Sequence, residues 1–346
     1  MALATLGIGA AVAQTAPTRT EKILTDLAGL SAEERQKRLE EGARQEGALV
    51  MDPNMRGQLL RDHTRLFQNR YPFLKVEYSD LSDEQAADRF VIEETAGRHL
   101  TDLIGVTVPD LANMLKRDLL AANPTPSVSR LLPGYRGFID PKNRWVPWYW
   151  SEHGISYNSR LVSAAEAPKS WDDLCNPAYR GQISFEPFEF KFLAGLYLMM
   201  GDQKFGEWTK CLGDNKPILQ EGHITRMELM FAGDHAIQGD NFLYDGMARL
   251  TANKALPFGI VWSAPIMARA GVVAISKEAK HPYAAALYAD WLLTDESQKF
   301  VHAGFRGPLT MAHPFITEST QLFTYGEIPE GAYEKILAYW RANVAK

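Results

Sequence analysis

The sequence contains little cysteine, no excess of positive charge and no long apolar run. Only two cysteines, Cys175 and Cys211, occur among 346 residues, so the alternatives are one disulfide in an oxidising compartment or two buried free thiols. Lys and Arg number 37 against 42 Asp and Glu, and the net charge of −5 lacks the basic footprint of a nucleic-acid-binding protein. No stretch reaches the roughly 20 apolar residues that a membrane-spanning helix needs.

Sequence motifs of familiar enzyme classes are also missing. The chain contains no Gly-x-Ser-x-Gly, no Walker A loop, no Gly-x-Gly-x-x-Gly and no His-Glu-x-x-His. Carboxylate pairs such as Asp172 and Asp173 lie at expected helix starts, where capping explains them. We therefore expect a protein that is not an enzyme and holds no cofactor. A two-lobed enzyme with an unrecognised site is the rival class.

The N-terminus is typical of a secretory signal. "MALATLGIGAAVAQ" is a run of apolar and small residues that ends in Ala11-Val12-Ala13, an A-x-A-like cleavage site before Gln14. A basic n-region is missing, and a buried helix or frayed tail is the alternative interpretation. The pattern predicts export to the periplasm, with residues 1–20 as a signal-like or flexible N-terminus.

The rest of the chain alternates between short apolar segments and amphipathic ones. Strands are expected at 48–52, 74–80 and 101–107, each followed by a helical pattern. An aromatic stretch, Trp145 to Trp150, precedes a further expected strand at 153–157, after which strands and helices alternate again. This order predicts an α/β protein with mainly parallel sheets covered by helices on both faces.

Four segments resemble the periplasmic solute-binding proteins of ABC importers, nearest to the extracellular solute-binding family 1 of ferric-iron type. The match covers about Gly47 to Arg306. The segments are "GISYNSRLV" (154–162), "APKSWDDLCNPAYRGQIS" (167–184), "FAGDHAIQGDN" (231–241) and "GVVAISKEAKHPYAAALYADWLLTDESQKFV" (271–301).

The resemblance implies two lobes of type II topology, joined by crossover strands and closing on a hinge. Lobe one is expected at 21–150 with 266–346, and lobe two at 151–265. Such a protein is usually a monomer that delivers a small-molecule ligand to ABC permease subunits in the inner membrane. A ligand-sensing subunit for a receptor would share every one of these features.

The aromatic stretch lies just before the expected hinge. Trp148, Tyr149 and Trp150 could line the interlobe cleft, because aromatic walls bury large areas and supply directed hydrogen bonds. Strand geometry places Trp148 and Trp150 on one face and Tyr149 on the other. We expect one face in the cleft and the other in the core of lobe one.

The resemblance also gives a test for iron. Ferric-binding members have two adjacent tyrosines after the Asn that matches Asn241; here Tyr244 matches the second, and Leu243 stands at the first. Leu cannot ligate a metal, and the loop "MDPNMRGQ" lacks the family's histidine. Ferric iron, a hard cation, is therefore the alternative ligand, with an unorthodox set made of Tyr244, His223 and Glu186.

A small, anionic organic ligand is the favoured expectation. Strand-to-helix turns offer free backbone N–H groups that attract anions, and Arg226 or Arg269 could clamp one in bidentate fashion. His153 is expected to bond to the backbone at the hinge. The ligand-binding residues expected on these grounds are Asn54, Thr107, Trp148, Tyr149, Trp150, Glu186, His223, Thr225, Asn241 and Tyr244.

Overall fold

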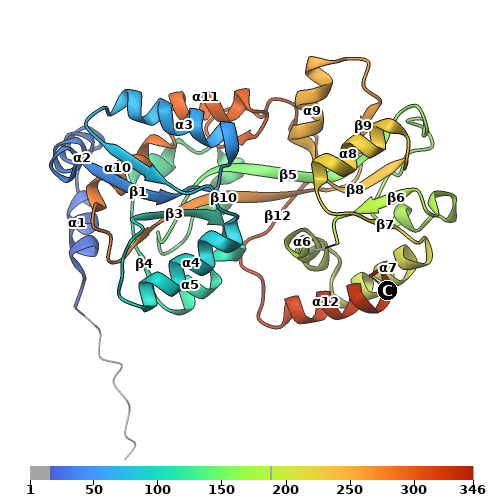
Figure 1. Ribbon diagram of the computed structural model, residues 1–346, viewed down its shortest axis with the longest axis horizontal. Coiled ribbons are helices and arrows are strands. Elements are labelled where there is room, and N and C mark those ends of the chain that lie inside the picture. Colours follow the sequence, from blue (N-terminus) through green and yellow to red (C-terminus); the bar gives the residue numbers. More distant parts are fainter. Residues whose placement is uncertain (1–15, 188, 346) are drawn as a thin grey trace, which may run out of the picture.

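The computed structural model describes residues 16–187 and 189–345, so the predicted signal sequence lies almost entirely outside the described residues. Two lobes lie side by side and share one mixed sheet (Figure 1). The sheet contains β1 (Ala48–Asp52), β2 (Lys75–Tyr78), β3 (Leu103–Thr107), β4 (Leu120–Ala121), β5 (Val146–Asn158), β6 (Ile183–Phe185), β7 (Ile218–Leu219), β8 (Ile237–Phe242), β9 (Phe258–Ile260), β10 (Ile266–Ser276), β11 (Gly307–Pro308) and β12 (Leu322–Thr324).

The strand order explains how one sheet serves two lobes. Its main path is β2-β1-β3-β10-β5-β8-β6-β7. The β1–β2, β1–β3, β6–β7 and β6–β8 pairs are parallel, and so is the pair of β10 with β12 off this path. Along the main path, β5 and β10 run antiparallel to each other and to their other neighbours, β8 and β3. All 13 residues of β5 and all 11 of β10 are buried, so these two strands form the crossover that joins the lobes.

Helices cover the sheet in both lobes. Those of lobe one are α1 (Arg19–Ala28), α2 (Ala32–Glu46), α3 (Gly57–Arg70), α4 (Asp83–Thr95), α5 (Ala112–Lys116), α10 (Pro282–Trp291) and α11 (Asp295–Ala303). Those of lobe two are α6 (Phe190–Met200), α7 (Asp202–Asp214), α8 (His223–Ala232), α9 (Leu243–Ala252) and α12 (Ala332–Asn343). Short 3₁₀ turns are η1 (Val108–Leu111), η2 (Pro126–Arg130), η3 (Pro133–Phe138), η4 (Asp172–Cys175) and η5 (Pro177–Tyr179).

Local sequence chemistry accounts for several helix ends. Ser31 and Glu34 form the expected capping box at the start of α2, which ends at Gly47 in a left-handed conformation. Thr294 is the N-cap of α11, where the sequence places the start of a helix. Ser31 and Glu34 satisfy backbone amides that the start of α2 leaves unpaired, whereas the Thr294 hydroxyl donates to the Trp291 carbonyl instead of capping α11.

Two hydrophobic clusters form the cores of the lobes. The first takes most of its residues from the chain up to Trp150 and from Ile266 to Ile316, and the second takes most of its residues from Ile155 to Ala264. The second also includes Ile336 and Trp340 of α12, which packs on α6 and α7. The C-terminal helix therefore joins the core of lobe two, which differs from the expectation that 266–346 belongs to lobe one. The sequence of an amphipathic helix at a chain end predicts which of its faces is buried. It does not predict against which lobe that face packs.

A disulfide links Cys175, at the end of η4, to Cys211 of α7, with the two Cα atoms 5.3 Å apart. The bond closes a loop within lobe two across a sequence separation of 36 residues. On the chain-entropy model it stabilises the fold by roughly 3–4 kcal/mol. Within the described part of the chain, no helix has both the length and the apolar character to cross a membrane.

Candidate ligand-binding site between the lobes

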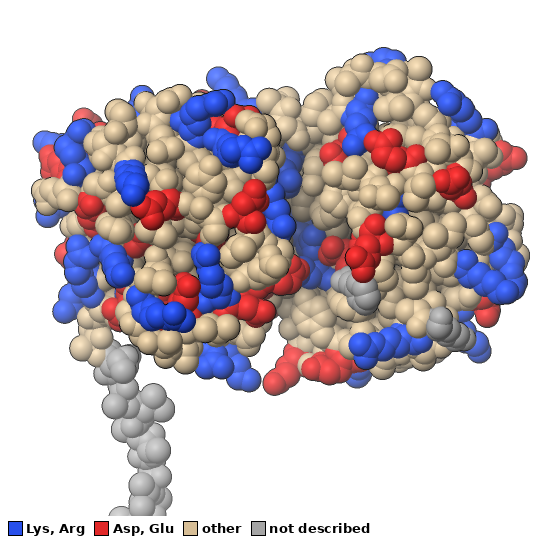
Figure 2. All heavy atoms as spheres, viewed as in Figure 1, with Lys and Arg blue, Asp and Glu red and all other residues tan. Residues whose placement is uncertain are grey.

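A groove of about 1080 Å³ runs between the lobes. In Figure 2, Lys and Arg atoms are visible deep between the lobes, and Asp and Glu atoms lie along the edges. The walls of this groove come from α4, η1 and α5 of lobe one, from the start of α6, and from the segment that leads into α12. Its charged lining residues are Glu84, Asp88, Asp110, Lys116, Arg144, Glu189, Lys191, Glu327, Glu330 and Glu334.

Arg306 and two tyrosines meet where the lobes join. The guanidinium carbon of Arg306 lies 4.4 Å from the ring centroid of Tyr244 and 5.3 Å from that of Tyr149, and one of its nitrogens donates to the Tyr244 hydroxyl at 3.3 Å. Tyr149 comes from β5, Tyr244 from the first turn of α9, and Arg306 from the loop after α11. Phe305, directly before Arg306, has a φ of 59°, a strained value for a bulky residue. The local backbone is thus held in the conformation that aims Arg306 at both rings.

Electrostatics at this cluster favour neutral phenols around a permanent cation. Burial raises the pKa of Tyr149 and of Tyr244, so both hydroxyls stay protonated in neutral solution. Burial acts to lower the pKa of Arg306, but Tyr244, Tyr149 and the Glu152 carboxyl outweigh it and the pKa rises. The cluster therefore presents a positive charge with two neutral hydroxyls beside it.

Tyr149 is fixed in place by the loop after β1 and by β10. Its hydroxyl donates to the Asn54 carbonyl at 3.2 Å, and its ring lies over Gly271. A Cβ on Gly271 would come within 2.0 Å of that ring. The Asn54 amide bonds to the Val106 carbonyl and accepts from the Trp148 indole at 3.2 Å, so its side chain ties β1, β3 and β5 together.

In lobe two, Arg226 of α8 has two carboxylate neighbours. It forms a buried ion pair with Asp240 at the end of β8 and lies 3.8 Å from Glu186. Glu186 also accepts from the Gly222 amide at 2.7 Å. Burial raises the pKa of Asp240 to about 6, although Arg226 acts against this shift. This network holds the β6, β7 and β8 ends of lobe two in register.

Two further cations, Lys191 in the groove lining and Arg269 on the crossover strand β10, are also paired. Arg269 of β10 bonds to Glu189 at 2.9 Å. Lys191 of α6 reaches across the groove to lobe one, with its amine 2.8 Å from Asp110 and 2.5 Å from Glu84. Asp110 in turn accepts from the Thr107 hydroxyl at 2.6 Å. The Lys191 pairs therefore connect lobe two to the predicted ligand loop of lobe one.

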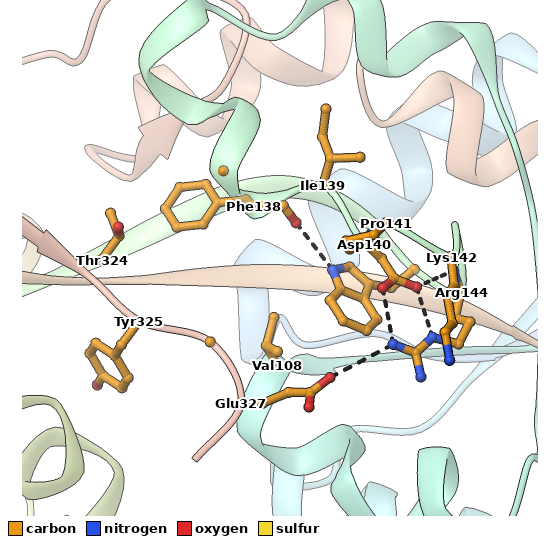
Figure 3. A pocket seen from close by; sticks show the side chains of 13 residues that line it. Val108, Phe138, Ile139, Asp140, Pro141, Lys142, Arg144, Thr324, Tyr325 and Glu327 are labelled. Atoms are coloured by element: carbon orange, nitrogen blue, oxygen red, sulfur yellow. Dashed lines mark hydrogen bonds and ion pairs between the residues drawn. The ribbon is translucent and has the colours of Figure 1, made fainter. Parts of the chain in front are cut away.

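A second, smaller pocket of about 380 Å³ lies between η3 and the segment after β12 (Figure 3). Arg144 in its wall pairs with Asp140 at 2.8 Å and with Glu327 at 3.7 Å. The Trp145 indole donates to the Phe138 carbonyl at 3.1 Å. Because the charged Arg144 and the indole already have partners, this pocket offers a ligand fewer free groups than the Arg306 cluster.

The family of the chain follows from its sequence. The family described as "Bacterial extracellular solute-binding protein" matches residues 98–320, well over half of the chain. This chain belongs to that family. Its members are extracellular or periplasmic proteins that bind small solutes and work with ABC permeases. No curated protein matches the chain as a whole.

Solved structures of solute-binding proteins share the fold. Iron-bound HitA from Pseudomonas aeruginosa has a TM-score of 0.73 at 19% identity, covering 85% of this chain and 98% of HitA. IdiA (FutA) from Trichodesmium, in complex with iron and citrate, has a TM-score of 0.71 at 15% identity, covering 87% and 100%. AfuA from Actinobacillus pleuropneumoniae, with bound fructose-6-phosphate, has a TM-score of 0.69 at 18% identity, covering 86% and 99%. These structural matches show that this solute-binding protein has the two-lobed fold. The sequence identities are too low to identify its ligand.

The predicted residues of this solute-binding protein fall into separate environments. Tyr149 and Tyr244 meet at Arg306, whereas Trp148 and Trp150 pack against His63 and His313. All three predicted residues of the aromatic stretch are buried in the core of lobe one, so the expectation that one face lines the cleft is not met by the residues that line the groove. The aromatic stretch belongs to β5, whose alternation points Tyr149 to the opposite face from Trp148 and Trp150. Thr225 is exposed on the first turn of α8.

The remaining predicted residues lie on strands and helices of lobe two or on the crossover strand β5. Asn241 is buried and bonds to the Ser156 hydroxyl at 2.9 Å. His223 lies 3.4 Å from Asp245 and stacks edge-on against Phe242. His153, expected to bond to the backbone, is buried, and neither ring nitrogen has a hydrogen-bond partner among the described residues. Burial first, and then Arg269, lower its pKa well below the ordinary value.

The proposed iron ligands have other partners. Tyr244 bonds to Arg306, His223 pairs with Asp245, and Glu186 bonds to Gly222. Across residues 16–187 and 189–345, no group of three or more His, Cys, Asp or Glu side chains is placed to hold a metal ion. The donor set present at Tyr244, a neutral phenol beside a guanidinium, does not fit a trivalent cation.

Sequence reasoning missed Arg306, the residue at the centre of the cluster. It lies at the edge of the segment that resembles the family, between Gly304 and Gly307. An arginine in a glycine-flanked loop after a helix was the available signal, but Arg residues in loops are usually solvated. Its importance follows only from the placement of Tyr149 and Tyr244, which are more than 60 residues away in the chain.

Proposed function

We propose that this protein captures a small, anionic organic solute between its lobes and delivers it to the permease of an ABC importer. The anionic group would bind Arg306 and the hydroxyl of Tyr244, beside the ring of Tyr149, whose own hydroxyl donates to the Asn54 carbonyl. The observation that carries the proposal is the contrast between Arg306 and Arg226, Arg269 and Lys191. In the described part of the chain, each of those three has a carboxylate within ion-pair distance, and Arg306 has none.

The carboxyl groups of the interlobe groove favour a ligand with further polar groups. Glu189 and Asp110 line the groove, and Asp83 lies at the start of α4 close to Asp110. Burial and the charge of Asp110 raise the pKa of Asp83 to about 6. Carboxyl groups accept hydrogen bonds from hydroxyl or ammonium groups. The proposal therefore favours a hydroxylated or zwitterionic anion, such as a sugar phosphate or an amino acid derivative, over a bare metal ion.

Thermal unfolding of ligand-stripped protein against a panel tests this function. The panel contains phosphonates, sugar phosphates, carboxylates, amino acids, polyamines, and ferric iron with and without carbonate. A ligand at a hundred times its dissociation constant adds about 2.7 kcal/mol of stability. For a chain of this size, that corresponds to an upward shift of several degrees. We expect such a shift with one class of organic anion and none with ferric iron.

A matched pair of variants ties the shift to the site. Arg306→Gln removes the charge and is expected to weaken anion binding roughly 10- to 100-fold, because a charge-assisted hydrogen bond contributes about 1.5–3 kcal/mol. Arg98→Gln changes an exposed arginine after α4 and should bind as the wild type does. A shift with ferric iron alone, or an equal anion shift in Arg306→Gln, would contradict the proposal.

A further inference from the structure

Arg306 lies on a short loop whose backbone is held in an unfavourable conformation. Its neighbour Phe305 has a φ of 59°, in the left-handed region that bulky side chains avoid. Among the described residues, Phe305 belongs to neither hydrophobic cluster, so packing of its ring in a core does not account for this conformation. Backbone strain persists where surrounding contacts over-determine the local structure. The contacts that hold the loop therefore decide where Arg306 points.

The side chain of Gln298, on α11, holds this loop from one side and is completely buried. Its Oε1 atom accepts from the backbone amides of Leu309 at 2.6 Å and Thr310 at 3.2 Å. Its Nε2 atom donates to the backbone carbonyls of Trp148 at 2.6 Å and Leu292 at 2.8 Å. A side-chain amide has two donor hydrogens and two acceptor lone pairs, so all four positions are used. One side chain thus ties the loop to β5 and to the end of α10.

The loop is also paired with the strand that carries Tyr149. In β11, Gly307 pairs with Trp150 and Pro308 pairs with Tyr149. A Cβ on Gly307 would come within 2.3 Å of the Trp150 indole, so the loop backbone lies directly against that ring. β11 is only two residues long, and the hydrogen bonds of Gln298 extend its attachment to the next two residues of the chain.

These contacts connect Gln298 to the Arg306 cluster at both ends. On β5, Gln298 bonds to the carbonyl of Trp148, the residue directly before Tyr149. On the loop, it fixes the two residues that follow β11, and Arg306 directly precedes β11. Binding groups keep their geometry when neighbouring hydrogen bonds lock the segments that carry them.

We propose that Gln298 is a positioning residue, which holds the loop on β5 so that Arg306 is aimed at the rings of Tyr149 and Tyr244. The inference rests on the proposed function. It adds to that function the residue that sets the geometry of the anion site from a distance.

Loss of the four hydrogen bonds should let the loop relax. Methionine has nearly the shape of glutamine, but it has no donor and only a weak acceptor, so Gln298→Met fills the same space without holding the loop. A relaxed backbone at Phe305 removes the strain, and the conformation that aims Arg306 becomes a minor one. Because only that conformation binds an anion well, anion affinity should fall about five- to tenfold.

A second substitution distinguishes positioning from stability. Glycine adopts a φ of 59° without steric cost, so Phe305→Gly favours the aimed conformation even where Gln298 no longer holds the loop. In the Gln298→Met background, Phe305→Gly should restore anion affinity to within about twofold of the wild type. A purely structural role of Gln298 predicts no such rescue, because glycine replaces none of the lost hydrogen bonds.

The first experiment needs no ligand. A guanidinium that lies over aromatic rings has NMR signals displaced by the ring currents, so the Nε–Hε signal of Arg306 reports its place beside the two tyrosines. Arg306→Gln provides the assignment. We expect the displacement in the wild type, its loss in Gln298→Met, and its return when Phe305→Gly is added. Gln298→Glu serves if Gln298→Met does not fold: it keeps the side-chain shape, removes the amide donors to β5, and should move the signal in the same direction.

Asn215→Leu is the matched control. Asn215 is a buried residue of lobe two, and its side-chain amide donates to two backbone carbonyls, each at 2.8 Å. Like Gln298→Met, it should lower the melting temperature by several degrees, because buried carbonyls lose their donors. The Arg306 signal should keep its wild-type position. An unchanged Arg306 signal in Gln298→Met, or an equal change in Asn215→Leu, would overturn the positioning role.

The second experiment measures affinity for sulfate, an anion that does not titrate near neutral pH, by calorimetry well below the melting temperature of every variant. We expect weaker binding in Gln298→Met, recovery with Phe305→Gly, and wild-type affinity in Asn215→Leu. Absence of the rescue would overturn the positioning role alone. Absence of sulfate binding by the wild type, together with the expected Arg306 signals, would overturn the proposed anion site and leave the positioning of Arg306 intact.

Discussion

Lobe two and the junction of the lobes each contain a buried or half-buried arginine, Arg226 and Arg306, but the two arginines have different partners. Arg226 forms an ion pair with Asp240 and lies close to Glu186. Arg306 contacts two phenol rings and one hydroxyl. Buried ion pairs are expensive to desolvate and are tolerated when both charges are satisfied. The charge of Arg226 is therefore neutralised by protein carboxylates. The charge of Arg306 has no such partner among the described residues, which leaves it able to pair with an anion.

The same difference, between polar groups with partners and polar groups without them, recurs among buried residues near the junction of the lobes. Asn54 and Thr107, both at strand ends of lobe one, use their polar side-chain atoms to hold neighbouring segments. Glu152 and His153 on β5 are buried with unpartnered polar atoms. The position of a residue at a strand-to-helix turn thus predicts that it lies near the site. It does not predict whether the polar atoms of that residue are already bonded to the protein.

Replacing Arg226 is expected to have the largest effect on stability. Arg226→Met leaves Asp240 buried without its partner, which should lower the free energy of unfolding by about 3–5 kcal/mol near pH 7.5. Burial already raises the pKa of Asp240 to about 6, and loss of Arg226 raises it further. At pH 5 the carboxyl is then protonated, so the destabilisation should be smaller. Urea unfolding at the two pH values measures both quantities.

The double variant Arg226→Met/Asp240→Leu provides the control. Removing both charges should restore much of the lost stability, because neither partner remains unpaired. Equal stability of Arg226→Met and the wild type at pH 7.5 would show that the network is not structural, and the comparison between the two arginines would lose its basis.

Two glycines that pack against tyrosine rings allow an effect on ligand binding to be distinguished from an effect on stability. A Cβ at Gly271 would lie 2.0 Å from the Tyr149 ring, and a Cβ at Gly259 would lie 2.2 Å from the Tyr157 ring. Overpacking of this kind costs typically 1–3 kcal/mol, so Gly271→Ala and Gly259→Ala should both lower the melting temperature by several degrees. Only Gly271→Ala displaces a residue of the Arg306 cluster, Tyr149, and we expect only that variant to weaken sulfate binding in calorimetry. Equal affinity in the two variants would argue against a role for Tyr149.

The fold was largely accessible from the sequence because it depends on periodic patterns. Alternating strands and helices predicted the two-lobed α/β architecture, which is confirmed. The capping residues Ser31 and Thr294 marked two helix starts correctly. The strand expected at 153–157 is longer, because β5 begins at Val146 and includes the aromatic stretch. A run of aromatic residues hides the alternation that usually identifies a strand.

The site was less accessible, because it is assembled from segments far apart in the chain. Tyr149, Tyr244 and Arg306 come from β5, α9 and the loop after α11. The sequence indicated both tyrosines by a family resemblance and by strand geometry, but no local pattern connects them to Arg306. Arg226 and Arg269 were the arginines expected to clamp an anion, and the structure gives each a carboxylate partner. Whether a charge is paired depends on tertiary packing, which local sequence does not encode.

The smallest expected effect concerns the contact of Lys191 with lobe one. Its ion pairs with Asp110 and Glu84 bridge the groove. The Glu84 side chain is exposed, so that pair contributes at most about 1 kcal/mol, whereas Lys191 and Asp110 are largely buried. Lys191→Met should therefore weaken sulfate binding only about two- to fivefold, because the closed arrangement of the lobes loses one of its contacts. The radius of gyration of the ligand-free protein, measured by small-angle X-ray scattering, should increase.

Lys204→Met is the matched control for that variant. Lys204 pairs with Asp172 at 2.7 Å, but both residues belong to lobe two, so their ion pair cannot hold the lobes together. The control should leave the scattering profile and the sulfate affinity at their wild-type values. If Lys191→Met also leaves both unchanged, the interlobe pairs are incidental to closure. The arrangement of the lobes would then depend on the crossover strands β5 and β10 and on the contacts of Arg306 with Tyr149 and Tyr244.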